Sequence, residues 1–150
     1  MTLEDGRMYL DGVEITIDIR SDPVTAAVSQ VSAHPAVRAR LVAIQRHWVE
    51  AHGGRAVVEG RDIGSVVFPD AAVKVYLDAR PEVRAQRRAL QTGADPEVVM
   101  AEQERRDRLD SSRETSPLAV PDDAHIVDTS ELSFPEVVNV VLDLVAAAQS

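Results

Sequence analysis

Apolar residues recur along this chain at the spacing of amphipathic helices in some segments and in short runs typical of strands in others. The clearest helical repeat is formed by Val37, Leu41, Ile44 and Trp48. It predicts a helix that begins near Pro35 and ends at the glycine pair Gly53-Gly54. At this spacing we interpret Trp48 as an anchor in the core rather than as a stacking platform.

Capping and turn residues predict four more helices. An acidic residue directly before a proline marks a helix start at Asp22-Pro23 and again at Asp95-Pro96. A proline also opens the predicted helix 81–92, which a glycine ends. Ser133 and Glu136 form a capping box in front of the last helix, whose apolar residues repeat at helical spacing.

The strands are predicted from short apolar runs bounded by turn residues. Three of these runs cover residues 55–59, 73–77 and 125–128. Nearer the N-terminus, Asp11-Gly12 lies between two apolar runs, which is a strong signal for a two-residue hairpin turn. Residues 8–19 are therefore predicted to form a small antiparallel ribbon.

The order of these elements favours an α/β fold. Strands that alternate with helices imply a parallel sheet with helices on both faces, joined by right-handed crossovers. A length of 150 residues suits one domain. Three parallel strands are few for such a sheet, so we expect a central part of the architecture to be missing from this chain.

Composition and charge exclude several classes of function. The net charge of −9 argues against general nucleic-acid binding. No apolar run approaches about 18 residues, so no membrane-spanning segment is expected. The absence of cysteine fits a cytoplasmic protein and excludes thiolate chemistry. Fifteen of the sixteen basic residues are arginine, which either reflects genome base composition or suits bidentate recognition of phosphate.

Two polar segments carry the candidate chemistry. In the first, Arg106, Asp110 and Arg113 occur at i, i+4 and i+7, so on a helix they share one face. That helix is either solvated and salt-bridged or turned toward a polar ligand. In the second, a glycine-flanked turn over residues 60–64 follows a predicted buried strand, where open α/β sheets bind ligands. The histidines show no metal-binding spacing.

At this point the chain resembles the bacterial cytidylate kinases, which phosphorylate CMP and dCMP with ATP in pyrimidine nucleotide metabolism. The resemblance rests on ordered blocks of sequence that together span nearly the whole chain. These are Ala27-Val28-Ser29-Gln30-Val31-Ser32-Ala33 with Pro35, Val37 and Arg38; Glu59-Gly60-Arg61-Asp62-Ile63-Gly64 with Val66-Val67-Phe68-Pro69-Asp70-Ala71; Lys74-Val75-Tyr76-Leu77-Asp78-Ala79; Arg84-Ala85-Gln86-Arg87-Arg88; Arg106-Asp107; Asp110-Ser111-Ser112-Arg113; and Ser116-Pro117-Leu118.

The resemblance implies roles for several of the matching residues. Those that recognise cytosine and hold the substrate are Ser29, Arg106 and Asp110. Those that gather around phosphate are Arg38, Arg61 and Arg113, with Arg87 and Arg88 as further phosphate or lid residues. Asp62 matches the acidic partner of the sugar. We expect Arg61 and Arg113 to be the most sensitive positions, because a transition-state arginine contributes roughly 10³ to 10⁵ in rate.

The resemblance also implies a fold and a domain organisation. The family has the parallel sheet of P-loop nucleoside monophosphate kinases, with helices on both faces. Residues 1–150 would be one partial domain, in which residues 1–33 are a remnant of the CMP-binding insertion and residues 34–150 are the core and lid region.

One family feature is missing from the sequence. These kinases begin with a strand, a Gly-x-x-x-x-Gly-Lys-Ser/Thr loop and a helix, and that pattern occurs nowhere in the 150 residues. The loop holds the ATP phosphates and supplies a hydroxyl for magnesium, so ATP and Mg²⁺ are expected from the family without a ligand in this chain. Three explanations stay open: a start that is too late, a second chain that supplies the loop, or a descendant that binds CMP without phosphorylating it.

The sequence therefore leaves three functional hypotheses. The chain is the acceptor-binding and lid half of a cytidylate kinase, a non-catalytic CMP-binding module, or a relic domain without a ligand. If the central strand is absent, its neighbours lose their ladder partners and expose apolar surface. We then expect poor solubility, self-association or a rearranged sheet.

Overall fold

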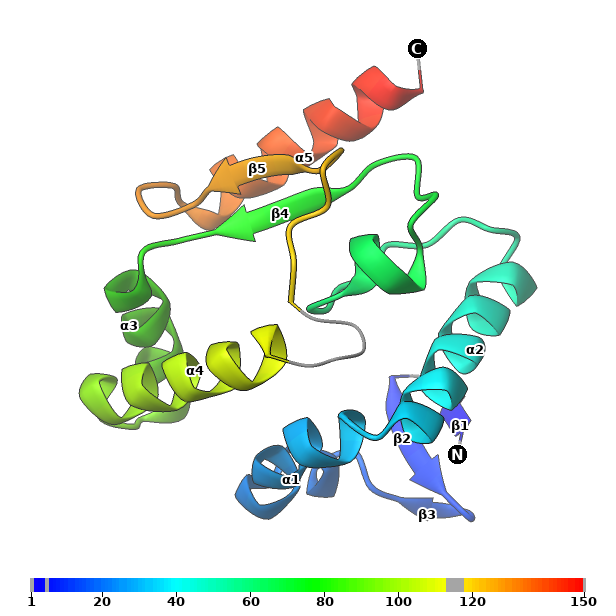
Figure 1. The fold of residues 1–150 in the computed structure, drawn as a ribbon, viewed down its shortest axis with the longest axis vertical. Coiled ribbons are helices and arrows are strands. Elements are labelled where there is room, and N and C mark those ends of the chain that lie inside the picture. Colours follow the sequence, from blue (N-terminus) through cyan, green and yellow to red (C-terminus); the bar gives the residue numbers. More distant parts are fainter. Residues whose placement is uncertain (1, 5, 113–117, 150) are drawn as a thin grey trace. The chain divides into compact units, whose positions relative to one another are not determined.

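The computed structural model describes residues 2–4, 6–112 and 118–149 (Figure 1). The chain divides into two compact units, Met1–Leu41 and Val42–Ser150. The strands are β1 (Thr2–Glu4), β2 (Arg7–Leu10), β3 (Val13–Glu14), β4 (Val75–Asp78) and β5 (His125–Asp128). The helices are α1 (Asp22–Ser32), α2 (Pro35–Ala51), α3 (Pro81–Thr92), α4 (Pro96–Ser111) and α5 (Phe134–Ala148). No helix in the described ranges is long and apolar enough to span a membrane.

The N-terminal unit contains a three-stranded antiparallel sheet in the order β1-β2-β3. Asp11 and Gly12 both adopt positive φ, at 51° and 82°, as a two-residue turn of this kind requires. The predicted hairpin is therefore confirmed, whereas the ribbon is shorter than predicted because β3 ends at Glu14. A short 3-10 turn over Asp18–Arg20 replaces its last part, and β1 was not predicted.

Helix α1 begins one residue earlier than its capping signal suggested. Ser21 is the N-cap residue, with extended backbone, and Asp22 is already helical. The prediction of Asp22 as N-cap was therefore wrong by one position, because the preceding 3-10 turn delivers Ser21 in the extended conformation that a cap needs. Helix α2 confirms its predicted limits: Gly53 and Gly54 follow it, both with a φ of 73°.

The C-terminal unit contains a two-stranded parallel sheet of β4 and β5, in which Val75 is paired with His125 and Asp78 with Asp128. The predicted strand over residues 55–59 is wrong: this segment forms no strand, and Val57 is fully exposed. A strand is held by hydrogen bonds to a neighbour, and no described strand pairs with these residues. The chain is thus a mixed α/β protein with a small parallel sheet.

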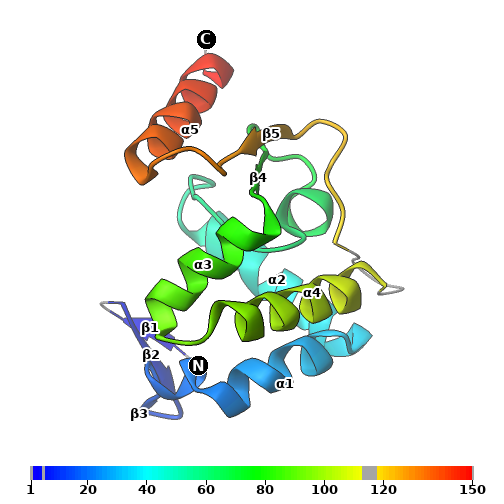
Figure 2. The same cartoon turned by 90° about the vertical axis from the view of Figure 1, so that its left-hand side faces the viewer.

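Helices α3 and α4 pack side by side and connect the two parallel strands, as Figure 2 shows. Small residues allow this close packing: Ala85, Ala89 and Val99 are buried, and Met100 packs against them. The predicted end of α3 and the predicted start of α4 are both confirmed. Gly93 adopts the left-handed conformation after α3, and the side chain of Asp95 accepts a hydrogen bond from the backbone of Glu97 at the start of α4.

The apolar stripe of α2 is not a core stripe. Trp48 is 45% exposed and stacks on His52, with ring centroids 4.1 Å apart. The prediction of Trp48 as a core anchor was therefore wrong. Helical spacing shows that residues share a face, but it does not show that another element covers that face.

Candidate active site

The segment that follows residue 60 is shaped by two close approaches. A side chain at Gly60 would place its Cβ 2.8 Å from the Ile63 side chain, and one at Gly64 would come within 3.2 Å of Pro121. Glycine leaves the space that both contacts need. Between the two glycines, Arg61 and Asp62 lead into a π-helical turn over Ile63–Val67.

That turn is fixed to the end of α2. Arg46 donates hydrogen bonds from Nε to the carbonyl of Val67 at 2.7 Å and from Nη2 to the carbonyl of Val66 at 2.9 Å. Val67 is itself almost fully buried. The guanidinium group of Arg46 satisfies two backbone carbonyls of the turn, and the burial of Val67 holds the turn in place. Arg61 therefore precedes a supported segment rather than a free loop.

Helix α4 carries the charged residues that contact Arg61. Arg106, Asp107 and Asp110 lie at its C-terminal end, at i, i+1 and i+4, so Arg106 and Asp110 share a face. The backbone carbonyl of Asp110 accepts a hydrogen bond from the backbone N–H of Leu118 at 2.9 Å. The end of the helix is thereby tied to the chain beyond it.

These segments meet in a cluster of three arginines and two aspartates. Arg61 forms an ion pair from Nε to Asp110 and a hydrogen-bonded ion pair from Nη2 to Asp107. Asp107 also accepts a hydrogen bond from Nη1 of Arg84 on α3, at 2.9 Å. Arg106 Nε lies 3.8 Å from the carboxylate of Asp110. We call these five residues the Arg61 cluster.

The cluster holds a carboxylate that is almost entirely removed from water. Asp110 is 1% exposed, and a buried carboxylate is strongly unfavourable unless cations and donors compensate it. Arg61 and Arg106 supply that compensation. Of the five charges, three are positive and two negative, so the cluster keeps one positive charge that can attract an anion.

Asp107 stays ionised despite partial burial. Burial opposes its negative charge, but hydrogen bonds from Arg61 and Arg84, reinforced by their positive charges, hold the pKa of its carboxyl below the ordinary value. At neutral pH this side chain is therefore a fixed anion between two guanidinium groups.

The structure brings together three of the residues that the sequence singled out. Arg61, Arg106 and Asp110 contact one another in the cluster. Asp62 directly follows Arg61 and is the N-cap residue of the π-helical turn. The helix prediction at Arg106 is confirmed. Of its two alternatives, a fully solvated face does not hold for Asp110, because an arginine from a distant segment covers that carboxylate.

The two remaining arginines of α3 have other contacts. Arg87 donates to the hydroxyl of Thr129 at 3.0 Å and to its carbonyl at 2.6 Å, which ties α3 to the turn after β5. Arg88 is exposed and lies 3.4 Å from the side-chain oxygen of Gln91. Among the described residues, neither forms a hydrogen bond or ion pair with the Arg61 cluster.

The other candidate residues lie elsewhere or outside the description. Ser29 is on α1 and Arg38 is near the start of α2, both in the N-terminal unit. The side chain of Ser29 is outside the described part of the structure, as is the whole of Arg113.

Two residues of the cluster were missed by sequence reasoning. Asp107 is three residues before Asp110 on the same helix, so a search for carboxylates one turn from a candidate would have found it. Arg84 lacked such a signal. Its contact with Asp107 depends on the packing of α3 against α4, which local sequence does not specify.

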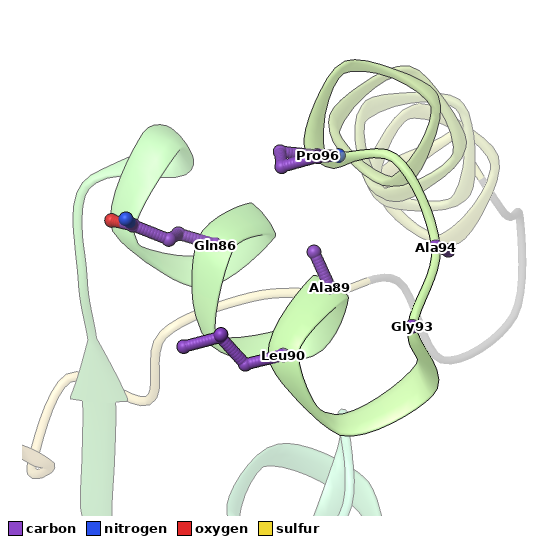
Figure 3. A pocket seen from close by; sticks show the side chains of 6 residues that line it. All are labelled: Gln86, Ala89, Leu90, Gly93, Ala94 and Pro96. Atoms are coloured by element: carbon purple, nitrogen blue, oxygen red, sulfur yellow. The ribbon is translucent and has the colours of Figure 1, made fainter.

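A hollow of about 350 Å³ lies at the turn between α3 and α4, apart from this chemistry. Figure 3 shows Ala89 and Pro96 facing each other across it. The lining residues are Gln86, Ala89, Leu90, Gly93, Ala94 and Pro96. None of them carries a charge, so this hollow lacks groups for acid–base chemistry or phosphate binding.

The side chains of the described residues do not gather into a metal site. Within residues 2–4, 6–112 and 118–149, no group of three or more histidine, aspartate or glutamate side chains could hold a metal ion. The described residues therefore do not offer a complete protein site for Mg²⁺, whose ligands are mainly oxygen atoms.

Fold and cluster define a class: a mixed α/β protein whose chemistry is that of guanidinium groups held by carboxylates. The family profile described as cytidylate kinase matches residues 1–147. The chain is also 51% identical to a cytidylate kinase of Mycobacterium leprae over 150 residues, which covers 97% of this chain and 67% of that relative. A cytidylate kinase of Rhodococcus opacus is 52% identical, over 93% of this chain and 63% of the relative.

The chain therefore belongs to the cytidylate kinase family. A similar match, at 50% identity, is found with a cytidylate kinase of Corynebacterium glutamicum. The chain spans about two thirds of the length of the curated relatives it matches, between 63% and 67% for these three.

Proposed function

We propose that this chain is the acceptor-binding and lid half of a cytidylate kinase, which transfers a phosphoryl group from ATP to CMP or dCMP. The observation that carries the proposal is the buried carboxylate of Asp110, which two arginines compensate, in a chain of this family. Its fold would be that of P-loop nucleoside monophosphate kinases. Residues 1–33 would be a remnant of the CMP-binding insertion, and residues 34–150 the core and lid.

The proposed roles follow from the chemistry of each side chain. A carboxylate at Asp110 and a guanidinium at Arg106 can pair with the amino and carbonyl edge of cytosine. Ser29 is assigned to the recognition of the same base. Asp62 is assigned to the sugar. The residues assigned to phosphate are Arg61, Arg38 and Arg113, with Arg87 and Arg88 as further lid or phosphate residues.

Phosphoryl transfer mainly requires positioning and charge neutralisation, which guanidinium groups provide. In this proposal Arg61 holds the acceptor phosphate and stabilises the charge of the transferring group. ATP is the donor. Mg²⁺ is expected with it, but no step is assigned to the metal, because the described residues supply no complete site.

A second candidate function is a non-catalytic CMP-binding module. The observation in its favour is the same compensated carboxylate of Asp110, because base recognition needs that group whether or not phosphate is transferred. Transfer also needs a loop such as Gly-x-x-x-x-Gly-Lys-Ser/Thr to bind the phosphates of ATP. In the kinase hypothesis, a preceding segment or a second chain supplies this loop.

The two functions are separated by an assay of ADP formation from ATP, magnesium and CMP. It should be run on this chain and on a fusion that adds an N-terminal segment with a Gly-x-x-x-x-Gly-Lys-Ser/Thr loop, each with an Arg113→Ala variant. Turnover of the fusion that is lost in its variant supports the kinase. A fusion that binds CMP but stays silent supports the binding module, and absence of both activities contradicts both functions.

A further inference from the structure

The carboxylate of Asp107 contacts two arginines from different segments. Its Oδ1 contacts Arg61, which precedes the π-helical turn, and its Oδ2 accepts from Arg84 of α3. It is thus the link between three segments that are distant in sequence. All three side chains are only partly exposed, so water competes less strongly than at an open surface.

The way Arg61 is held leaves part of its guanidinium group available. Nε is directed to Asp110 and Nη2 to Asp107, which occupies one edge of the planar group. Its Nη1 has no hydrogen-bond or ion-pair partner among the described residues. Because two carboxylates fix the occupied edge, the remaining donors have a defined direction.

Arg84 is held in a similar way but by one carboxylate. Its Nη1 donates to Asp107, and its Nε is buried without a hydrogen-bond partner in the part of the chain described. The two guanidinium groups therefore share one anion. A phosphate could bind both guanidinium groups at once, and the side chain of Asp107 sets the distance between them.

We propose that Asp107 is a positioning residue that fixes Arg61 and Arg84 as a pair for the phosphate group of the ligand. The inference deepens the proposed function and rests on it in one respect, namely that the ligand is a nucleotide. Asp107 itself does not touch the ligand. It acts by reducing the conformational freedom that the two arginines would otherwise lose on binding.

The variant that tests this role is Asp107→Asn, which keeps the size of the side chain but removes its charge. One amide oxygen cannot hold both arginines as two carboxylate oxygens do. A matched control is Glu104→Gln on the same helix, where Glu104 lies 3.7 Å from Arg108 in an exposed pair. Asp107→Glu restores the charge and should recover part of the effect.

Affinity should be measured by calorimetry with CMP and with cytidine, which lacks the phosphate. We expect Asp107→Asn to weaken CMP binding roughly tenfold, while the affinity for cytidine changes less than twofold. Glu104→Gln should leave both unchanged. Equal weakening of CMP and cytidine would point to a purely structural role and overturn the proposal, as would an Asp107→Asn variant that binds CMP normally.

A titration with inorganic phosphate, followed through the NMR signals of the arginine side chains, separates this inference from the proposed function. Shifts at Arg61 and Arg84 that disappear in Asp107→Asn support the inference even if the chain does not select CMP. If the wild-type signals do not move at millimolar phosphate and CMP does not bind, the proposed pair is wrong.

Discussion

Asp110 combines near-complete burial with a charge, so its neighbours decide whether it is tolerated. Its ion pair with Arg61 joins segments that are distant in sequence, whereas its ion pair with Arg106 spans one turn of the same helix. Loss of the long-range partner leaves a buried carboxylate with less compensation. At the scale of residues, the cluster therefore contributes to stability as well as offering a site.

The first prediction concerns Arg61→Ala. We expect the free energy of unfolding to fall by about 2 kcal/mol, below the roughly 3–5 kcal/mol of a fully buried pair because Arg61 is partly exposed. Urea unfolding monitored by circular dichroism measures this. Arg108→Ala, which removes only an exposed pair, should change the value by less than about 0.5 kcal/mol, and equal effects of the two variants would contradict the account.

A second prediction follows from the lowered pKa of Asp107. A carboxyl whose pKa is lower in the folded state than its unfolded value of about 3.9 stabilises the fold above that value, and loses its contribution as the pH falls through the folded pKa. The difference in unfolding free energy between wild type and Asp107→Asn should be constant from about pH 5 to 7. It should shrink as the pH falls below about 4, whereas a difference that does not change with pH would show that the charge is not responsible.

At the scale of elements, capping and turn residues predicted the limits of helices and strands wherever local interactions determine those limits. The limits of α3 and the strand β5 were predicted closely, because prolines, glycines and capping residues act within a few positions. The segment 55–59 has an apolar, strand-like sequence, yet it forms no strand. Strand formation requires a neighbour, and the identity of that neighbour is not encoded in the segment itself.

The capping of α4 gives a prediction at this scale. Asp95→Ala should destabilise the protein by about 1 kcal/mol, because the backbone N–H of Glu97 loses its acceptor. Asp95→Asn keeps an oxygen at the same place and should cost only a few tenths of a kcal/mol. Thermal unfolding of the two variants tests the cap, and equal losses would show that charge rather than the hydrogen bond matters.

At the scale of the whole molecule, the C-terminal unit exposes large apolar side chains. Phe134 is 81% exposed, Ile126 65%, and Leu142 59%. The family resemblance gave Arg61, Arg106 and Asp110 as candidate residues. Helical spacing by itself placed only Arg106 and Asp110 on one face. The contact with Arg61 and the roles of Asp107 and Arg84 depend on tertiary packing, which no periodicity shows.

Exposed apolar surface of this kind predicts self-association. Sedimentation velocity should show a mean mass that rises with protein concentration. The double variant Ile126→Thr, Leu142→Gln should lower that association, since it removes two of the exposed apolar groups. A wild-type chain that stays monomeric over the same concentrations would contradict the expectation.

The central claim is that the Arg61 cluster belongs to a site that selects cytidine nucleotides, and a calorimetric titration of the chain with CMP and AMP tests it most directly. We expect CMP to bind at least about tenfold more tightly than AMP, because a site built to hydrogen-bond one base leaves polar groups unpaired with another. Asp110→Asn, confirmed as folded by circular dichroism, should lose that preference. Equal affinity for CMP and AMP in the wild-type chain would contradict the account.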